Sequence, residues 1–75
     1  MDKIKSLMAI HPEYAETLQA YAENDMNAIE TAKAIYCHRN TIGYRFAKIN
    51  EYTGIDPTSF RGLCQLLQYV EVTEC

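Results

Sequence analysis

The stretch "YCHRNTIGYRFAKI", residues 36–49, is the part of this 75-residue chain from which its fold can be worked out. It carries Arg39, Arg45 and Lys48 and no carboxylate, although the whole chain has a formal net charge of −3. The wider window 31–50 holds four of the seven basic residues and none of the ten acids. Because salt screens charges beyond about 8 Å, a charged ligand responds to such a local patch. We therefore expect a negatively charged partner, with a chance cluster on a solvated helix as the alternative.

Residues 39–52 have the spacing of an amphipathic helix. At about 100° per residue, three apolar side chains fall within about 60° of one another. These are Ile42, Phe46 and Ile49. The opposite side has no acid and consists of Asn40, Gly43, Tyr44 and Ala47. Arg39 and Lys48 flank that side, and Arg45 lies nearer the apolar edge. The pattern predicts a helix with one buried face and one face available to a polyanion, for which duplex DNA is the leading candidate.

A shorter helix is predicted just before it. Asn27 suits the N-cap, and Glu30 three residues later completes a pattern like a capping box. The helix should run to about Ile35, with a narrow inner face of Ala28, Ala32 and Ile35. Two helices separated by about three residues are typical of a helix-turn-helix unit, which here spans about 27–53. In such a unit the first helix braces the second, which enters the major groove of DNA.

The rest of the chain also reads as helical, which predicts an all-α domain of four to five short helices. Residues 2–10 should form an opening helix that ends near His11-Pro12, because proline disfavours helix in the residue before it. Pro12 then suits the first turn of a second helix, and 23–27 reads as a loop. Gly54 supplies the stop after the basic helix. Asp56-Pro57 should open a last helix with an apolar stripe of Phe60, Leu63, Leu66, Leu67 and Val70.

Composition bounds the class of protein. With 48% hydrophobic and 23% charged residues, the chain is expected to be one folded, soluble domain covering 1–75. No apolar run approaches the roughly 20 residues that span a bilayer, and no signal peptide is evident. Three irregularly spaced cysteines indicate a reducing compartment. We expect a cytoplasmic protein with no membrane partner.

Nothing in the sequence predicts a metal, a cofactor or an enzyme. No cysteine pair has the Cys-x2-4-Cys spacing of structural zinc, so Cys37-His38 with Cys64 or Cys75 is a poor ligand set. We expect Cys37 to fill the core and Cys64 to belong to the apolar last helix. Tyrosines 14, 21 and 69 are interpreted as half-buried core, whereas Tyr36 could cap the turn or pack on its neighbours. RNA binding lacks the aromatic platform usual for single strands.

The segment "NAIETAKAIYCHRNTIGYRFAKINEYTG", residues 27–54, resembles the C-terminal helix-turn-helix of PucR- and CdaR-type bacterial transcription regulators. That family shows a pattern close to N-x3-T-A-x2-L-x-V-H-R-N-T-L-x-Y-R-L-x-K-I-x3-T-G. The "HRNT-x2-YR" core, residues 38–45, is the most specific part of the likeness, which extends loosely over 13–72. A weaker likeness to the DNA-binding end of the nucleoid protein Fis implies the same geometry.

The resemblance implies roles in DNA binding for seven residues and places an eighth, Gly43, on the same DNA-binding face. His38 and Arg39 would start the recognition helix, with Arg39 near a base edge or a phosphate, because Arg can contact guanine bidentately. Asn40 would face a base or stabilise the helix start. Thr41 and Tyr44 would donate hydrogen bonds to the sugar-phosphate backbone, and Arg45 and Lys48 would pair with phosphates. An ion pair with Glu51 or Glu30 is the structural alternative for Arg45. Gly43 departs from the family, which usually has a large, often basic side chain there, so weak affinity or dependence on dimerisation is expected.

The resemblance also implies partners. A homodimer would place two recognition helices about one DNA turn apart, ~34 Å, through contacts of the last or the opening helix. The family joins this module to an upstream sensor region, so the chain is expected to be a C-terminal fragment of a longer regulator. The alternative is a helical dimerisation or protein-interaction module that kept the fold with little DNA affinity. Gly43 and the negative net charge favour that alternative.

Overall fold

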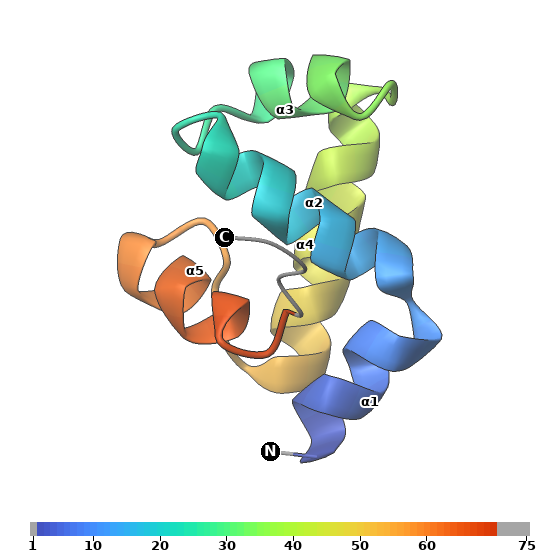
Figure 1. The fold of residues 1–75 in the computed structure, drawn as a ribbon, viewed down its shortest axis with the longest axis vertical. Helices are drawn as coiled ribbons and strands as arrows, with labels where there is room; N and C mark the ends of the chain where they lie inside the picture. Colours follow the sequence, from blue (N-terminus) through green and yellow to red (C-terminus); the bar gives the residue numbers. More distant parts are fainter. Residues whose placement is uncertain (1, 71–75) are drawn as a thin grey trace.

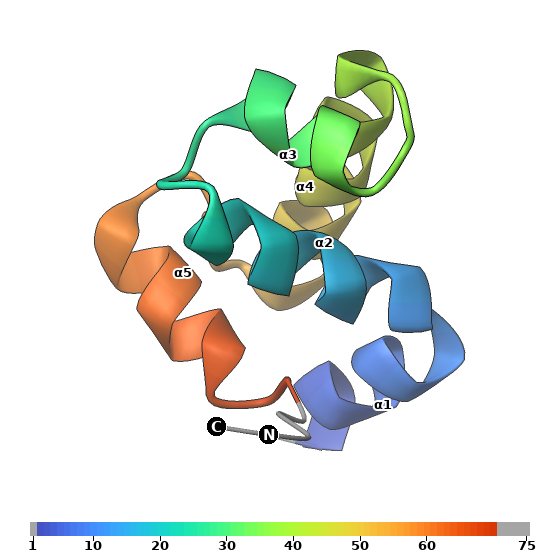
Figure 2. The same cartoon turned by 45° about the horizontal axis from the view of Figure 1, so that its top comes forward.

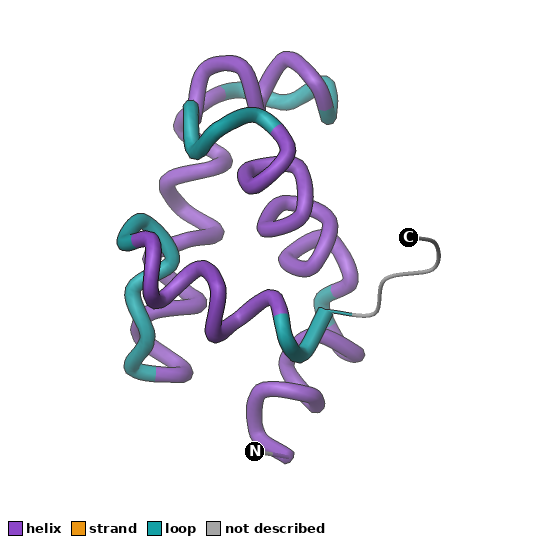
Figure 3. Tube along the Cα trace, turned by 60° about the vertical axis from the view of Figure 1, so that its left-hand side comes forward, coloured by secondary structure: helices purple, strands orange, loops and turns teal. Residues whose placement is uncertain are grey.

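A computed structural model describes residues 2–70, and these form five α-helices joined by short loops (Figures 1 and 3). The helices are α1 Asp2–Ile10, α2 Pro12–Glu23, α3 Ala28–Ala34, α4 Arg39–Thr53 and α5 Phe60–Leu67. The described residues contain no strand, which confirms the predicted all-α class. None of the helices in this range is long and apolar enough to cross a bilayer.

Helix α2 is the centre of the domain. It contacts each of the other four helices, and α3 packs in addition on α4. Figures 1 and 2 show α3 and the start of α4 at one end of the molecule and α1 at the other. The core contains four fully buried aliphatic side chains, Leu18, Ile42, Ile49 and Leu66, which come from α2, α4 and α5. Each such side chain stabilises the fold by about 1.5–3 kcal/mol relative to exposure.

The break between α1 and α2 lies where the sequence predicts it. His11 separates the two helices, and Pro12 occupies the first position of α2, where its missing N–H leaves no bond unmade. The His11 ring stacks on Tyr14 with 4.6 Å between centroids, and its Nδ1 lies 3.1 Å from Glu13 Oε2. A backbone hydrogen bond of Glu13 lowers the pKa of its carboxyl, and His11 adds to that shift.

Helix α3 begins as predicted, but its inner face differs. The Asn27 side chain accepts the Glu30 N–H at 3.1 Å, which confirms the N-cap. In a capping box the Glu30 side chain would in turn accept the Asn27 N–H. Here the Asn27 N–H donates to Asn24 O instead. Thr31 and Ala32 are buried, whereas Ala28 is exposed, so its predicted inner position is wrong. Ala28 instead lines a shallow groove together with Tyr21 of α2 and Asn40 of α4.

Helix α5 starts later than the sequence predicts. Asp56-Pro57 does not open it, because Asp56 Oδ1 accepts hydrogen bonds from the Thr58 N–H and hydroxyl and folds 56–59 into a turn. Ser59 is the N-cap, with its Oγ accepting the Gly62 N–H at 3.0 Å. Of the predicted stripe, Leu63 and Leu66 are buried, Phe60 is 72% exposed, and Val70 is buried beyond the end of the helix.

Candidate nucleic-acid interface

Helix α4 has the two faces that its periodicity predicts. Ile42, Phe46 and Ile49 are buried, and the Phe46 ring meets Tyr21 of α2 edge-on with 4.7 Å between centroids. Gly54 ends the helix with a left-handed φ of 76°, and its N–H donates to Asn50 O. These anchors at three turns fix which side of α4 faces outward.

The outward side of α4 carries most of the residues proposed for DNA. Arg39, Asn40, Gly43, Ala47 and Lys48 are exposed, Tyr44 is 61% exposed, and Thr41 is half-buried. A Cβ added at Gly43 would meet nothing within 4 Å. Apart from Thr41, these residues are therefore accessible to a ligand.

His38 shapes the start of α4. Its Nδ1 accepts the Asn40 N–H at 3.0 Å, and its carbonyl accepts the Thr41 N–H at 2.8 Å. Because Nδ1 accepts, the ring nitrogen free to donate outward is Nε2. His38 therefore acts as the N-cap of α4 and still presents a donor beside Arg39.

Arg45 has a partner inside the domain. Its Nη1 donates to Thr17 Oγ1 at 2.9 Å, and the Thr17 hydroxyl donates in turn to Glu13 O at 2.7 Å. Thr17 is fully buried in α2. The two acids suggested as alternatives lie elsewhere, with Glu51 3.8 Å from Lys48 and Glu30 3.7 Å from Lys33. Arg45 thus ties α4 to α2 through a hydroxyl.

Lys48 is shared between an acid and a ring. Its Nζ lies 3.8 Å from Glu51 Oε1 and 5.7 Å from the centroid of the Tyr44 ring. Glu51 follows the acid-free window by one residue, so the positive face ends at the third turn of α4. Exposed ion pairs of this kind contribute little and are screened by salt, so Glu51 leaves Lys48 able to exchange partners.

A shallow groove of about 450 Å³ runs beside the outward face of α4. Its α4 wall includes Arg39, Asn40, Gly43 and Ala47, and Asp56 and Thr58 lie across from it. The absent side chain at Gly43 opens this groove. A larger hollow of about 790 Å³ lies elsewhere, between α1, α2 and the segment 68–70.

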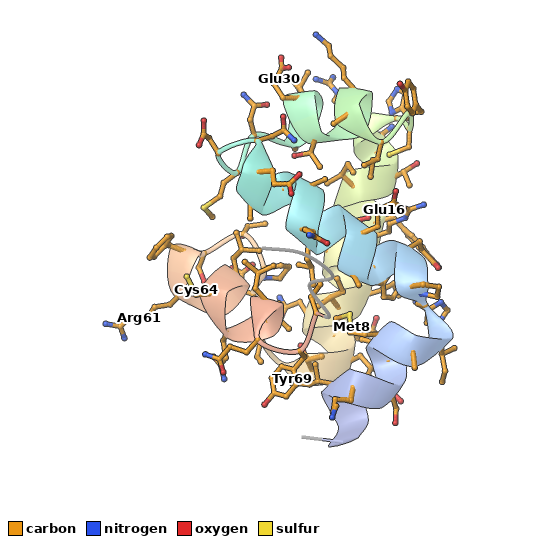
Figure 4. All side chains as sticks on the ribbon, in the orientation of Figure 1. Met8, Glu16, Glu30, Arg61, Cys64 and Tyr69 are labelled. Atoms are coloured by element: carbon orange, nitrogen blue, oxygen red, sulfur yellow. The ribbon has the colours of Figure 1, made fainter. Side chains whose placement is uncertain are left out.

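Among the described residues, no group of three or more His, Cys, Asp or Glu side chains could hold a metal ion. Cys37 is half-buried against the core, as predicted, whereas Cys64 is exposed on the outside of α5 (Figure 4). Cys75 lies outside the described residues. Tyr14 and Tyr21 are buried and Tyr69 is half-buried, which confirms their place in or against the core.

Sequence reasoning missed one residue near this interface, Thr17, and left a second, Tyr36, between two readings. Thr17 is a polar residue on the apolar face of α2, and that position was the available signal for a buried hydrogen bond. Tyr36 neither caps the turn with its side chain nor packs on its neighbours, because it is 95% exposed. Thr17 contacts α4 through Arg45, and Tyr36 precedes the N-cap of α4 by two residues.

The family model described as the PucR C-terminal helix-turn-helix domain matches residues 14–71. The chain is 39% identical over 54 residues to the proline-responsive transcriptional activator PutR of Bacillus subtilis (strain 168), covering 72% of this chain and 13% of PutR. It is 41% identical over 54 residues to the carbohydrate diacid regulator of Escherichia coli (strain K12), covering 72% of this chain and 14% of that protein.

A third relative is the transcriptional activator PmfR of Paenarthrobacter nicotinovorans, 48% identical over 44 residues, which cover 59% of this chain and 9% of PmfR. No solved structure matches the chain significantly. The chain thus spans a small share of the curated relatives it matches. The family match covers most of the chain and confirms the resemblance read from "HRNT-x2-YR". The chain belongs to the family of PucR C-terminal helix-turn-helix domains, the DNA-binding output domains of bacterial transcription regulators.

Proposed function

We propose that this chain binds double-stranded DNA sequence-specifically by placing the outward face of α4 in the major groove. One observation carries the proposal: three buried anchors hold a face without carboxylates outward over the first three turns of α4. The major groove of B-DNA admits an α-helix, and the first residues of the second helix of such a unit contact base edges.

The start of α4 supplies the groups that would read bases. Arg39 and Asn40 are exposed in the first turn, where a recognition helix meets base edges. Arg can pair bidentately with guanine and Asn with adenine, each contributing about 1–3 kcal/mol of discrimination. His38 would offer Nε2 beside them. Arg39 is assigned to a base or to the phosphate next to it.

The flanks of α4 would hold the DNA backbone. Tyr44 and Thr41 are assigned as hydroxyl donors to phosphate or sugar, and Lys48 as a charge on a phosphate. The Lys48–Glu51 pair is exposed, so a phosphate can replace the carboxylate. Arg45 keeps Nη1 on Thr17, so its contribution to phosphate binding falls to its remaining guanidinium donors.

Gly43 would limit affinity. It lies on the outward face without a side chain, where an added Cβ has open space. A single copy therefore makes few contacts, and we propose that two copies bind together with recognition helices about one DNA turn apart, ~34 Å. The exposed Phe60 on α5 and Ile10 on α1 mark the two candidate contact regions between copies.

We further propose that the chain is the C-terminal part of a longer regulator with an upstream sensor region. The support is the small share of each relative that the match covers, which is 13% of PutR and 14% of the carbohydrate diacid regulator. In that arrangement the sensor region would bring two of these domains together.

Selection of bound duplexes from a random pool, using a dimeric form of the domain, tests sequence-specific recognition. Enrichment of a common site is expected, and failure to enrich any site at low salt would contradict it. The affinity for that site should fall steeply with salt, because each neutralised phosphate adds about −0.9 to the logarithmic salt slope.

Arg39→Ala should weaken duplex binding by about 1–3 kcal/mol. Arg61→Ala is the matched control, because it removes the same charge from an exposed site on α5 whose side chain points away from the domain (Figure 4). The two variants should unfold alike and differ only in DNA binding. If Arg39→Ala and Arg45→Ala both bind like the parent, the chain is instead a helical dimerisation or protein-interaction module.

A further inference from the structure

The turn between α3 and α4 has a tyrosine where glycine is usual. Helix α3 ends with two hydrogen bonds: the Cys37 N–H donates to Ala32 O at 2.9 Å, and the Tyr36 N–H donates to Lys33 O at 3.3 Å. This pair of bonds defines a Schellman motif. Tyr36 occupies its left-handed position with a φ of 58°. Such a backbone is unfavourable for a residue with a Cβ, which is why glycine is common there.

Every other left-handed residue among those described has an evident reason. Gly54, at the end of α4, has no Cβ. Asp25, at the matching position after α2, has a short polar side chain of the kind that tolerates this region. Met26 has a φ of 60°, but its side chain packs against the core, and that contact offsets the strain.

Tyr36 lacks any such compensation within the domain. Its side chain is 95% exposed, the most exposed of the large hydrophobic residues in the described part of the chain. The turn that holds it projects at the edge of the molecule, at the same end as the start of α4 (Figure 2). Tyr36 stands two residues before His38, the N-cap of α4. Strained backbone positions cluster at functional sites, so a left-handed turn that keeps a large exposed side chain points to a role for Tyr36 outside the fold.

We propose that Tyr36 is a DNA-backbone contact: its phenol O–H donates to a phosphate oxygen of a strand bordering the groove entered by α4. This inference rests on the proposed function, because it assumes that α4 enters the groove. Tyrosine is among the side chains that bind phosphate and sugar and so fix the register of a protein on the duplex. The fixed left-handed backbone holds the ring outward before DNA arrives, so less ordering remains to be done on binding.

Two variants of the full 75-residue chain test this, with a mixed-sequence DNA duplex at low salt as the probe. Tyr36→Phe removes only the hydroxyl and should bind the duplex about tenfold to 100-fold more weakly, the effect of one lost hydrogen bond to a charged group. Its urea unfolding midpoint should not change. Tyr36→Gly should bind at least as weakly and yet unfold at the same or a higher urea concentration, because it relieves the left-handed strain.

The control is Asp25→Gly, which places glycine at the same φ after α2. It should keep duplex affinity or raise it, since it removes a negative charge. Because tyrosine is uncharged, the salt slope of the Tyr36 variants should equal that of the parent. A purely structural tyrosine would lower stability and affinity together in Tyr36→Gly, and that result would overturn the inference.

The failure of this inference can be told from the failure of the proposed function. If the parent binds duplex and Arg39→Ala weakens it while Tyr36→Phe binds like the parent, only the role of Tyr36 is wrong. If the parent does not bind duplex at all, the proposed function fails, and the inference fails with it.

Discussion

The two faces of α4 share one helix of fifteen residues but obey different constraints. The inner face is filled by Ile42, Phe46 and Ile49, which touch other helices and fix how α4 sits. The outer face includes Gly43, which contributes no side chain, and Tyr44, which is largely exposed. A domain built this way can change what it contacts without changing how it folds, because few outer residues contribute to the core.

The largest effect should follow from cutting the inner face. Ile42→Ala removes a fully buried side chain and should lower the free energy of unfolding by about 2–5 kcal/mol. Tyr44→Ala, one half-turn away on the outer face, should stay within about 0.5 kcal/mol of the parent. Urea unfolding measures both. Similar losses of unfolding free energy in the two variants would contradict the expected difference between the inner and outer faces.

Arg45 lies at the border of the two faces and is expected to show an intermediate effect. Thr17→Val keeps the buried volume but removes the hydroxyl that accepts Arg45 Nη1. The free energy of unfolding should fall by about 1–3 kcal/mol, because a partly buried donor loses its acceptor. Thr17→Ser, which keeps the hydroxyl, should recover most of that loss. Unfolding of Thr17→Val at the parent's midpoint would show that the bond contributes nothing.

A smaller effect, of opposite sign, is expected on the outer face. Gly43→Ala should raise the free energy of unfolding by up to about 1 kcal/mol, because alanine is the better helix former and the new Cβ meets no atom. Gly43→Arg should in addition make the salt slope of duplex binding steeper by about 0.9. If Gly43→Ala is less stable than the parent, Gly43 is constrained by neighbouring atoms as the inner-face residues are. That result would contradict an open outer face.

The smallest effect concerns the turn across the groove from Gly43. The Thr58 hydroxyl and then its N–H donate to Asp56 and hold the pKa of that carboxyl below its usual value of 3.8. Because the pKa of Asp56 is lower in the folded than in the unfolded state, the ionised carboxylate stabilises the fold at pH values above its unfolded pKa. That stability is lost as the pH falls through the folded pKa. Thr58→Val should raise the Asp56 pKa toward its usual value, as read by NMR titration of the carboxyl carbon. An unchanged pKa would assign the shift to the backbone donor alone.

Periodicity was enough to predict α4 and its inner face. Spacings of three and four residues place Ile42, Phe46 and Ile49 on one side whatever α4 packs against. Pro12, Asn27 and Gly54 likewise act locally, through a missing N–H, a side-chain acceptor and a left-handed φ. Features decided by a single unopposed local signal are therefore readable from sequence.

The misses have three separate causes. The Arg45–Thr17 bond joins residues 28 positions apart, so no local pattern announces it. The start of α5 was misplaced because two local signals compete, and the Asp56–Thr58 turn prevails over the proline signal at Pro57. Tyr36 was left ambiguous because its backbone conformation, which sets it apart, follows from how α3 ends.

The position of α2 sets the smallest piece of this protein that can be transplanted. Since α2 supplies the fully buried Leu18 to the core and touches every other helix, a peptide limited to 27–54 would keep the two-helix motif but lose the helix against which α3 and α4 both pack. Grafts onto other regulators should therefore carry the chain from Pro12 onward. A transplant of α3 and α4 therefore needs α2 as well.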